Sequence, residues 1–166
     1  DWRFEYKTME QDYHRRVQFS LLAMFEKGLV YRGKDPVLFC TNCKSAIAKA
    51  ETEEKEHETT FNTIEFTIAE TGEALPIATT RPEMLHTCQA VFYHPDGERA
   101  AKFKGKHALT PVFNKRVPLV ADEDVDEEFG TGVVMVCSFG DKEDVAWIYR
   151  HKLGIEDAWT HDGKII

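Results

Sequence analysis

An alternation of apolar and polar residues between positions 63 and 68 most limits how this chain can fold. Ile64, Phe66 and Ile68 alternate with threonines and a glutamate. This period of two predicts a strand with one buried face. The Glu-Thr-Gly-Glu sequence at 70–73 suits a turn, and the residues at 74–79 then predict a second strand.

The rest of the chain adds short strands and two helices. Further strands are expected at 90–93, 112–113, 117–120 and 133–137. The strands at 112–113 and 117–120 flank Asn114 and its basic neighbours and suggest a hairpin, whereas the apolar run at 133–137 suggests a strand buried on both faces. Helices are expected over 12–28, ending at Gly28, and over 142–153. Many short strands with few helices predict a mixed α/β fold that is mainly β, with a barrel or sandwich core and helices at its edges.

Composition limits the class of protein. The chain has 166 residues, 42% of them apolar, and carries a net charge of −8. It suits a soluble, cytoplasmic protein with no membrane span. The opening Asp1-Trp2-Arg3 is not a natural start, so we expect a piece of a longer protein. A protein that binds nucleic acid through phosphates is usually basic, so such binding needs a local patch. The candidates, which also fit an ordinary solvated face, are Lys102, Lys104, Lys106, His107, Lys115 and Arg116.

Two cysteines, Cys40 and Cys43, form a CxxC motif, while Cys88 and Cys137 stand alone. This usage suggests a reducing compartment. Two thiolates at this spacing can grip one zinc ion, but structural zinc needs four ligands. The motif is therefore either half of a zinc knuckle that residues outside this chain complete, or two reduced cysteines in a turn.

The sequence IATTRPE at 77–83 suits a helix start. Thr80 and Glu83 form a capping-box pattern, and Pro82 fits the first turn. This interpretation leaves Thr79 and Arg81 unexplained. Because a helix N-terminus offers free N–H groups, the segment could also meet a polar or anionic ligand.

A second helix start follows the apolar run at 133–137. Asp141 is expected to be the N-cap and Asp144 lies three residues later. Two carboxylates at the mouth of a buried strand could also hold an ammonium group. The acidic run at 122–128 lacks the spacing of a calcium loop, so we interpret it as a solvated loop without metal.

Taken together, these segments resemble the editing domain inserted in class I aminoacyl-tRNA synthetases for valine, isoleucine and leucine. The matching motifs are ATTRPE, VFYHPDGER, VPLVADEDVDEEFGTG and FGDKEDV, in the family's order. PVLFCTNCKSAIAKAE matches before them. Within the family the sequence looks most like the archaeal-type valyl enzymes. The resemblance implies a barrel-like editing core at 59–166, preceded by a helical and zinc-knuckle segment at 1–58.

The resemblance implies hydrolysis of mischarged threonyl-tRNA(Val) by a positioned water, without a cofactor. Valine and threonine have nearly the same shape, and an apolar pocket rejects a hydroxyl only weakly. The expected catalytic group comprises Asp141, which would hold the α-ammonium of the substrate, with Thr79 and Thr80. The expected partners are the 3′ end of the mischarged tRNA and the remaining domains of the parent synthetase.

The resemblance also implies a set of substrate-binding residues. Asp144 would meet the threonine hydroxyl, with Cys137 as its neighbour, and the glycines would let backbone approach the ligand. The full set is Arg81, Glu83, Gly130, Thr131, Gly132, Cys137 and Asp144. A structural zinc at Cys40 and Cys43 is expected only if residues outside the chain complete it.

Two alternatives stay open. The first is an isoleucyl editing domain, which would hydrolyse valyl-tRNA(Ile). It stays open because many bacterial valyl enzymes carry other residues where this chain has Met135, Cys137 and Gly140. A non-enzymatic RNA-binding module is the second alternative, because no Ser-His-Asp or Cys-His arrangement is evident in the sequence.

Overall fold

The computed structural model describes residues 3–166, so Asp1 and Trp2 lie outside the described part. The chain divides into two compact units, Asp1–Pro36 and Val37–Ile166. The CxxC motif thus belongs to the same compact unit as the main sheet, and the expected boundary at 58/59 stays a prediction.

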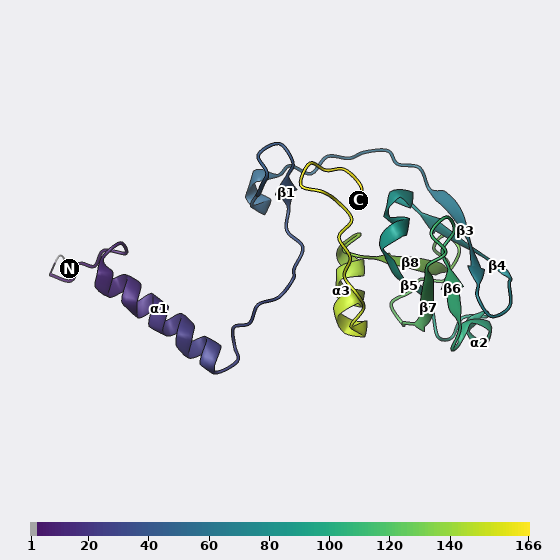
Figure 1. Ribbon diagram of the computed structural model, residues 1–166, viewed down its shortest axis with the longest axis horizontal. Coiled ribbons are helices and arrows are strands. Elements are labelled where there is room, and N and C mark those ends of the chain that lie inside the picture. Colours follow the sequence, from purple (N-terminus) through teal and green to yellow (C-terminus); the bar gives the residue numbers. More distant parts are fainter. Residues whose placement is uncertain (1–2) are drawn as a thin grey trace. The chain divides into compact units, whose positions relative to one another are not determined.

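The first unit is built on helix α1 (Gln11–Glu26) (Figure 1). The helix ends as predicted: Gly28 has a φ of 70°, and its N–H donates to the Phe25 carbonyl at 2.9 Å. The apolar face expected from the sequence is present, with Val17, Leu21 and Met24 on it. No described residue of α1 is buried, and residues 3–36 form no other helix or strand that could pack against the face.

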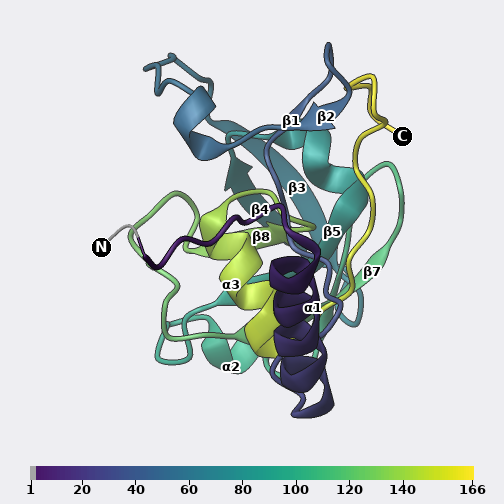
Figure 2. The same ribbon diagram turned by 90° about the vertical axis from the view of Figure 1, so that its left-hand side faces the viewer.

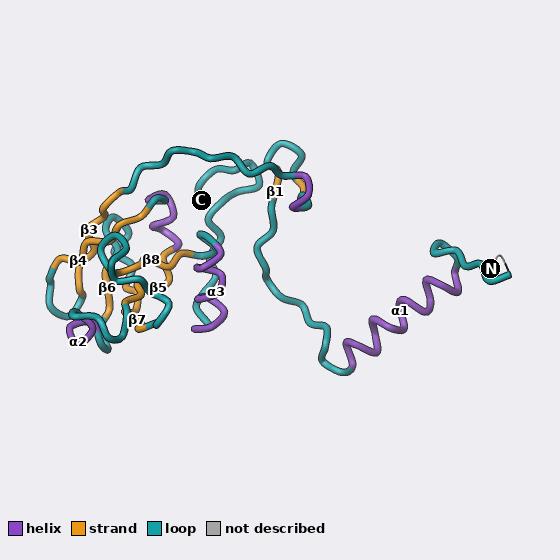
Figure 3. The backbone as a smooth tube through the Cα atoms, turned by 180° about the vertical axis from the view of Figure 1, so that it is seen from behind, coloured by secondary structure: helices purple, strands orange, loops and turns teal. Residues whose placement is uncertain are grey.

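The second unit is built on a six-stranded sheet in the order β4-β3-β6-β7-β5-β8 (Figures 1 and 3). Its strands are β3 (Asn62–Ile68), β4 (Ala74–Thr79), β5 (Cys88–Tyr93), β6 (His107–Leu109), β7 (Arg116–Ala121) and β8 (Val133–Cys137). Neighbouring strands are antiparallel except β5 and β7, which are parallel. The mainly β, mixed fold predicted from the sequence is confirmed.

The hairpin predicted from the alternation at 63–68 is present in the structure. β3 and β4 pair with Phe66 opposite Leu75 and Ile64 opposite Ile77. Phe66, Leu75 and Ile77 are at most 1% exposed. The apolar residues of both strands therefore point into one core, which fixes the register of the hairpin.

The sheet curls into a nearly closed, barrel-like shape. Its two edge strands, β4 and β8, lie next to each other in space. The described residues form no ladder between them. This seam between β4 and β8 is where the barrel stays open.

Helix α3 (Lys142–His151) packs on the outside of the barrel, beside β8 and β5 (Figures 1 and 2). Trp147 and Ile148 meet Phe92 and Val136 there in a second apolar cluster. Strands β5 and β8 therefore have apolar side chains on both faces, as the continuous run at 133–137 predicted. The short α2 (Ala100–Phe103) adds Phe103 to the inner core.

The predicted hairpin of 112–113 with 117–120 is wrong. The antiparallel partner of β7 is β6, with Ala108 opposite Val117. Thr110 closes the connecting loop, because its N–H donates to the Lys115 carbonyl and its hydroxyl accepts from the Lys115 N–H, both at 3.0 Å. Val112 is 83% exposed at the loop tip, with a φ of 66°. The apolar side chain of Val112 suggested a strand in the sequence, but the structure places this residue in a turn.

The acidic run at 122–128 is solvated only in part. Val125 is 3% exposed, and the Asp122 side chain is 4% exposed. Asp122 accepts hydrogen bonds from Arg150 at 3.1 Å and from His151 at 2.6 Å. Burial would raise the pKa of Asp122, but hydrogen bonds from His151 and other donors bring it down to about 2. The expectation of a wholly solvated loop is therefore wrong at Asp122, which fixes the end of α3.

No described helix combines the length and apolarity that crossing a membrane requires.

Candidate functional site

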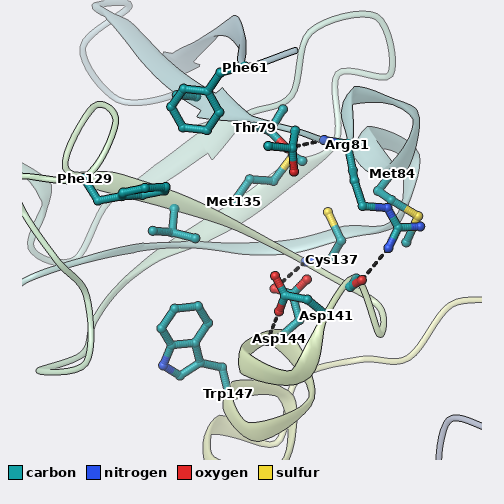
Figure 4. Close-up of a pocket in the computed structure, with 14 residues that line it drawn as sticks. Phe61, Thr79, Arg81, Met84, Phe129, Met135, Cys137, Asp141, Asp144 and Trp147 are labelled. Carbon is teal, nitrogen blue, oxygen red and sulfur yellow. Dashed lines mark hydrogen bonds between the residues drawn. The ribbon is translucent and has the colours of Figure 1, made fainter. Parts of the chain in front are cut away.

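A cavity of about 280 Å³ opens at the seam between β4 and β8 (Figure 4). Strand β4, the 3-10 helix η2 (Pro82–Thr87), strand β8 and the start of α3 form its walls. Its polar side carries Thr79, Thr80, Arg81, Asp141 and Asp144, with the Gly140 backbone. The other lining residues are Phe61, Ala78, Met84, Phe129, Val134, Met135, Cys137 and Trp147.

Asp141 begins α3 as the sequence predicted. Its carboxylate oxygen Oδ1 accepts a hydrogen bond from the Asp144 N–H at 2.8 Å. Asp141 is exposed to solvent and lines the cavity. It keeps acceptor capacity for a cation, because an ionised carboxylate accepts about four hydrogen bonds.

Asp144 lies deeper, one turn further along α3. The residue is 6% exposed, and its Oδ1 accepts from the Cys137 N–H at 3.4 Å. Burial and the negative charge of Asp141 raise the pKa of Asp144 to about 7. The two carboxylates thus differ in environment: one is exposed, and the other is buried and titrates near neutrality.

Gly140 makes room for the buried carboxylate. A Cβ atom at this position would lie 2.0 Å from Asp144 Oδ2. The backbone of Gly140 therefore packs directly against Asp144, and any side chain there would displace it.

The predicted capping box at Thr80 and Glu83 is wrong. The element is a 3-10 helix whose N-cap is Arg81, and no side chain caps it. The hydroxyl of Thr79 instead accepts from the Arg81 N–H at 3.0 Å, and Glu83 pairs with Arg81 Nε at 3.2 Å. The cause is the backbone of Arg81, whose φ of −129° and ψ of 67° are not helical, so the helix starts one residue late.

Arg81 links the two sides of the cavity. Its guanidinium donates a hydrogen bond to the carbonyl of Gly140, beside the start of α3 (Figure 4). The end of β4 and the start of α3 are therefore held together across the seam. The otherwise unexplained Arg81 of the sequence has a structural role, with its side chain at the cavity wall.

The structure brings together six of the predicted site residues. Thr79, Thr80, Arg81, Cys137, Asp141 and Asp144 line the same cavity. Glu83, Gly130, Thr131 and Gly132 do not line it. Gly130 instead packs behind the wall, since a Cβ there would lie 3.2 Å from the Ala78 Cβ atom. With φ values of 62° and 69°, Gly130 and Gly132 shape the loop that carries Phe129.

Three aromatic residues of the cavity were missed. Phe61 and Phe129 meet edge to face, with ring centroids 5.5 Å apart. Trp147 follows Asp144 by three residues on α3, a spacing that places both on one helix face. Phe129 stands inside the EEFGTG motif and Trp147 inside the predicted helix. The only sign in the sequence that these two residues could line the site was their closeness along the chain to other candidate residues.

Cys137 is a neutral neighbour rather than a nucleophile. It lies opposite Cys88 in the β5–β8 ladder, and it is 2% exposed. The hydrogen bond with Cys88 and burial raise the pKa of Cys137 far above its ordinary value. A thiolate is the reactive form of cysteine, so this thiol serves as a small apolar group in the wall.

The CxxC motif lies in a hairpin of β1 (Phe39–Cys40) and β2 (Ser45–Ala46). The Cys43 N–H contacts Cys40 Sγ at 3.4 Å, and this backbone donor lowers the pKa of Cys40. The hydrogen-bond interaction between the Cys43 thiol and the Cys40 side chain raises the pKa of Cys43. Among residues 3–166 no group of three or more metal-ligating side chains includes them. The two thiols alone do not fit a structural zinc, and the zinc knuckle stays a prediction that needs outside ligands.

The candidate basic patch is largely offset by acidic partners. Glu73 pairs with Lys102, and Glu70 pairs with His107 and Arg116. Hydrogen bonds to Glu70, led by the one from the His107 N–H, lower its pKa to about 2. The paired basic residues are Lys102, His107, Lys115 and Arg116. This pairing offsets four of the six candidate residues, and no ion pair is found for the remaining two, Lys104 and Lys106, among the described residues.

Comparisons with known proteins agree with the resemblance to class I aminoacyl-tRNA synthetases. The family model for class I tRNA synthetases (I, L, M and V) matches residues 1–158. A valine–tRNA ligase of Methanocaldococcus jannaschii is 48% identical over 165 residues, which are 99% of this chain and 19% of the relative. That of Methanothermobacter thermautotrophicus is 49% identical over 163 residues, which are 98% of this chain and 19% of the relative. The chain thus spans about a fifth of the length of these relatives.

A solved structure shares the fold. The LeuRS of Agrobacterium radiobacter, in a ternary complex with tRNA and LeuAMS, aligns with a TM-score of 0.53 at 18% identity. The alignment covers 64% of this chain and 17% of that one. The chain belongs to the class I tRNA synthetases, as a segment similar to archaeal valine–tRNA ligases.

Proposed function

We propose that this chain is the editing domain of a valyl-tRNA synthetase. It would hydrolyse the ester of mischarged threonyl-tRNA(Val) by attack of a positioned water. The valine–tRNA ligase relatives support the valyl assignment, and the cavity at the seam supports the hydrolytic one.

The observation that carries the proposal is the pair of unlike carboxylates in one cavity. Asp141 is exposed to solvent and can accept a charge-assisted hydrogen bond from the substrate ammonium. Asp144 is buried beside it and can meet the side chain of the same aminoacyl group. The two contacts together would fix the ester within the cavity.

Asp144 would also discriminate between threonine and valine. Its carboxyl pairs with the β-hydroxyl of threonine, whereas the methyl of valine would leave it without that partner. An unsatisfied buried polar group costs about 1–3 kcal/mol, which corresponds to roughly 5- to 150-fold in rate. A carboxyl that titrates near pH 7 can accept from or donate to this hydroxyl.

Water is the expected nucleophile. The Cys137 thiol beside the cavity is held neutral, which makes it a poor nucleophile. Catalysis would then come chiefly from orientation of the ester and the water. Thr79 and Thr80 border the cavity at the end of β4, where their hydroxyls can contact the terminal ribose of the tRNA or the water.

The test uses the full-length synthetase and tRNA(Val) acylated beforehand with threonine. Asp141→Asn should slow deacylation by roughly 10- to 150-fold, the value of one charged hydrogen bond. Asparagine is as good an N-cap as aspartate, so α3 should form normally. Glu143→Gln, an exposed acid on the first turn of the same helix, is the matched control.

Wild-type deacylation speed in Asp141→Asn would refute the site assignment. Hydrolysis of valyl-tRNA(Ile) in preference to threonyl-tRNA(Val) would instead assign the domain to an isoleucyl enzyme. Tight tRNA binding without hydrolysis of either ester would favour an RNA-binding module.

A further inference from the structure

Trp147 forms one wall of the cavity next to the buried carboxylate. It lines the cavity, is 7% exposed, and stands three residues after Asp144 on α3. Figure 4 shows its indole beside Asp144, at the end of the cavity away from Arg81. The contacts proposed for the ammonium and the hydroxyl of the substrate do not involve this large side chain.

The indole is held rigidly. It meets Phe92 edge to face, with ring centroids 5.2 Å apart and planes inclined by 62°. It also packs in one apolar cluster with Ile148 of the same helix and Val136 of β8, and it is only 7% exposed. An aromatic side chain packed at the density of a protein interior resists displacement by a larger ligand.

The chemistry of threonine places a methyl group near this wall. The β-carbon of threonine carries both the hydroxyl and the methyl, so a hydroxyl bound to Asp144 brings the methyl into the immediate surroundings of that carboxyl. Two of the groups bordering Asp144 are Cys137, whose N–H bonds to it, and Trp147 on the next turn. Both offer apolar surface to a methyl group.

We propose that Trp147 is a specificity-determining residue that limits the size of the aminoacyl side chain in this cavity. The inference rests on the proposed editing function and adds a steric filter to it. Asp144 selects for the hydroxyl, and Trp147 rejects side chains longer than that of threonine.

The probe is an amino acid that differs from threonine only in length. β-Hydroxynorvaline keeps the α-ammonium and the β-hydroxyl but has an ethyl group in place of the methyl. One additional methylene changes selectivity by roughly 10- to 200-fold in a fitted apolar pocket. The full-length wild-type enzyme should therefore deacylate threonyl-tRNA(Val) faster than β-hydroxynorvalyl-tRNA(Val) by a factor in this range.

Trp147→Val should bring the ratio of the two rates close to one, mainly by accelerating hydrolysis of the longer ester. Trp147→Phe keeps an aromatic contact with Phe92 and should give an intermediate ratio. Trp159→Val is the matched control, because Trp159 is 41% exposed and lies outside the cavity lining. It should keep the wild-type ratio.

A second variant guards against misfolding of Trp147→Val. Val134 lines the same cavity from β8 and packs against the cluster that contains Trp147. Val134→Ala should also lower the ratio while leaving α3 intact. If the wild-type enzyme clears threonyl-tRNA and both variants keep its ratio, Trp147 is not the filter although the editing function stands. If the wild-type enzyme clears neither ester, the proposed function fails and the inference falls with it.

Discussion

Replacing Asp144 by asparagine should stabilise the chain at high pH and not at low pH. The variant keeps the size of the side chain and its acceptor oxygen for the Cys137 N–H. It removes a negative charge that is buried beside Asp141. In the native chain this charge must form inside the protein as the pH rises, and asparagine abolishes that cost.

The magnitude follows from the pKa of Asp144, which is raised from 3.8 to about 7. The difference of roughly three units corresponds to about 4 kcal/mol at 1.36 kcal/mol per unit. Between these two pKa values the unfolded chain has lost the proton and the folded chain still holds it. The free energy of unfolding therefore falls as the pH rises through this window. The cost is about 1.6 kcal/mol at pH 5 and reaches about 4 kcal/mol near pH 8.

The assay is urea unfolding of the 166-residue chain, followed by near-ultraviolet circular dichroism at several pH values. The difference between Asp144→Asn and the native chain should grow by about 2–3 kcal/mol from pH 5 to pH 8. Any change in packing adds an offset that does not depend on pH, so the slope carries the result. A difference that stays flat over this range would show that Asp144 is already ionised at pH 5 and would refute the reasoning.

Asp141→Asn supplies the control. It keeps the N-cap but removes the negative charge that contributes to the raised pKa of Asp144. The growth of the difference between pH 5 and pH 8 should therefore be smaller in this background. An unchanged slope would mean that burial alone raises the pKa.

Three further changes test other parts of the structure. Gly140→Ala places a Cβ 2.0 Å from Asp144 Oδ2; the resulting shift of the carboxylate should slow deacylation by the full-length enzyme roughly 100-fold, and an unchanged rate would contradict the packing. Asp122→Asn weakens the charged bond to His151 and should cost about 2.5 kcal/mol at pH 7 in urea unfolding. That loss should vanish as the pH falls through about 2, where native Asp122 takes up its proton. Val112→Asn relieves a β-branched residue at a φ of 66° and should raise the free energy of unfolding by about 1 kcal/mol; a lower melting temperature would count against this.

The parts of the fold with strong local signals were predictable. The alternation at 63–68 gave the β3–β4 hairpin, since only one face of that strand is apolar. Asp141 was predictable as an N-cap because its short carboxylate can reach the N–H of Asp144 three residues on. In both places the local sequence and the tertiary environment favour the same conformation.

The strand β6 was missed because its sequence carries little pattern. Of its three residues only Ala108 is buried, and it sits between a histidine and a leucine that are half-buried. Its pairing with β7 depends on contacts between distant segments. Val112 and Phe113 looked more like a strand, but they lie in the loop that Thr110 closes.

The sequence predicted only part of the set of residues that line the cavity, and it did not predict their geometry. The motifs named the two aspartates and the Thr-Thr-Arg segment. The hydrogen bond from Arg81 to the carbonyl of Gly140, 59 positions away, could not be read from local spacing. For the same reason the Thr80–Glu83 pattern suggested a cap that the backbone of Arg81 does not form.

The seam between β4 and β8 has a consequence for how such domains can diversify. Because the described residues form no ladder across it, the lining side chains can be exchanged without disturbing main-chain pairing between the two walls. Met135 and Cys137 stand on the β8 wall of the cavity, and the Cys137 N–H bonds to the buried carboxylate of Asp144. Natural variation at these two positions can therefore alter which ligands the cavity accepts while the same six strands continue to fold.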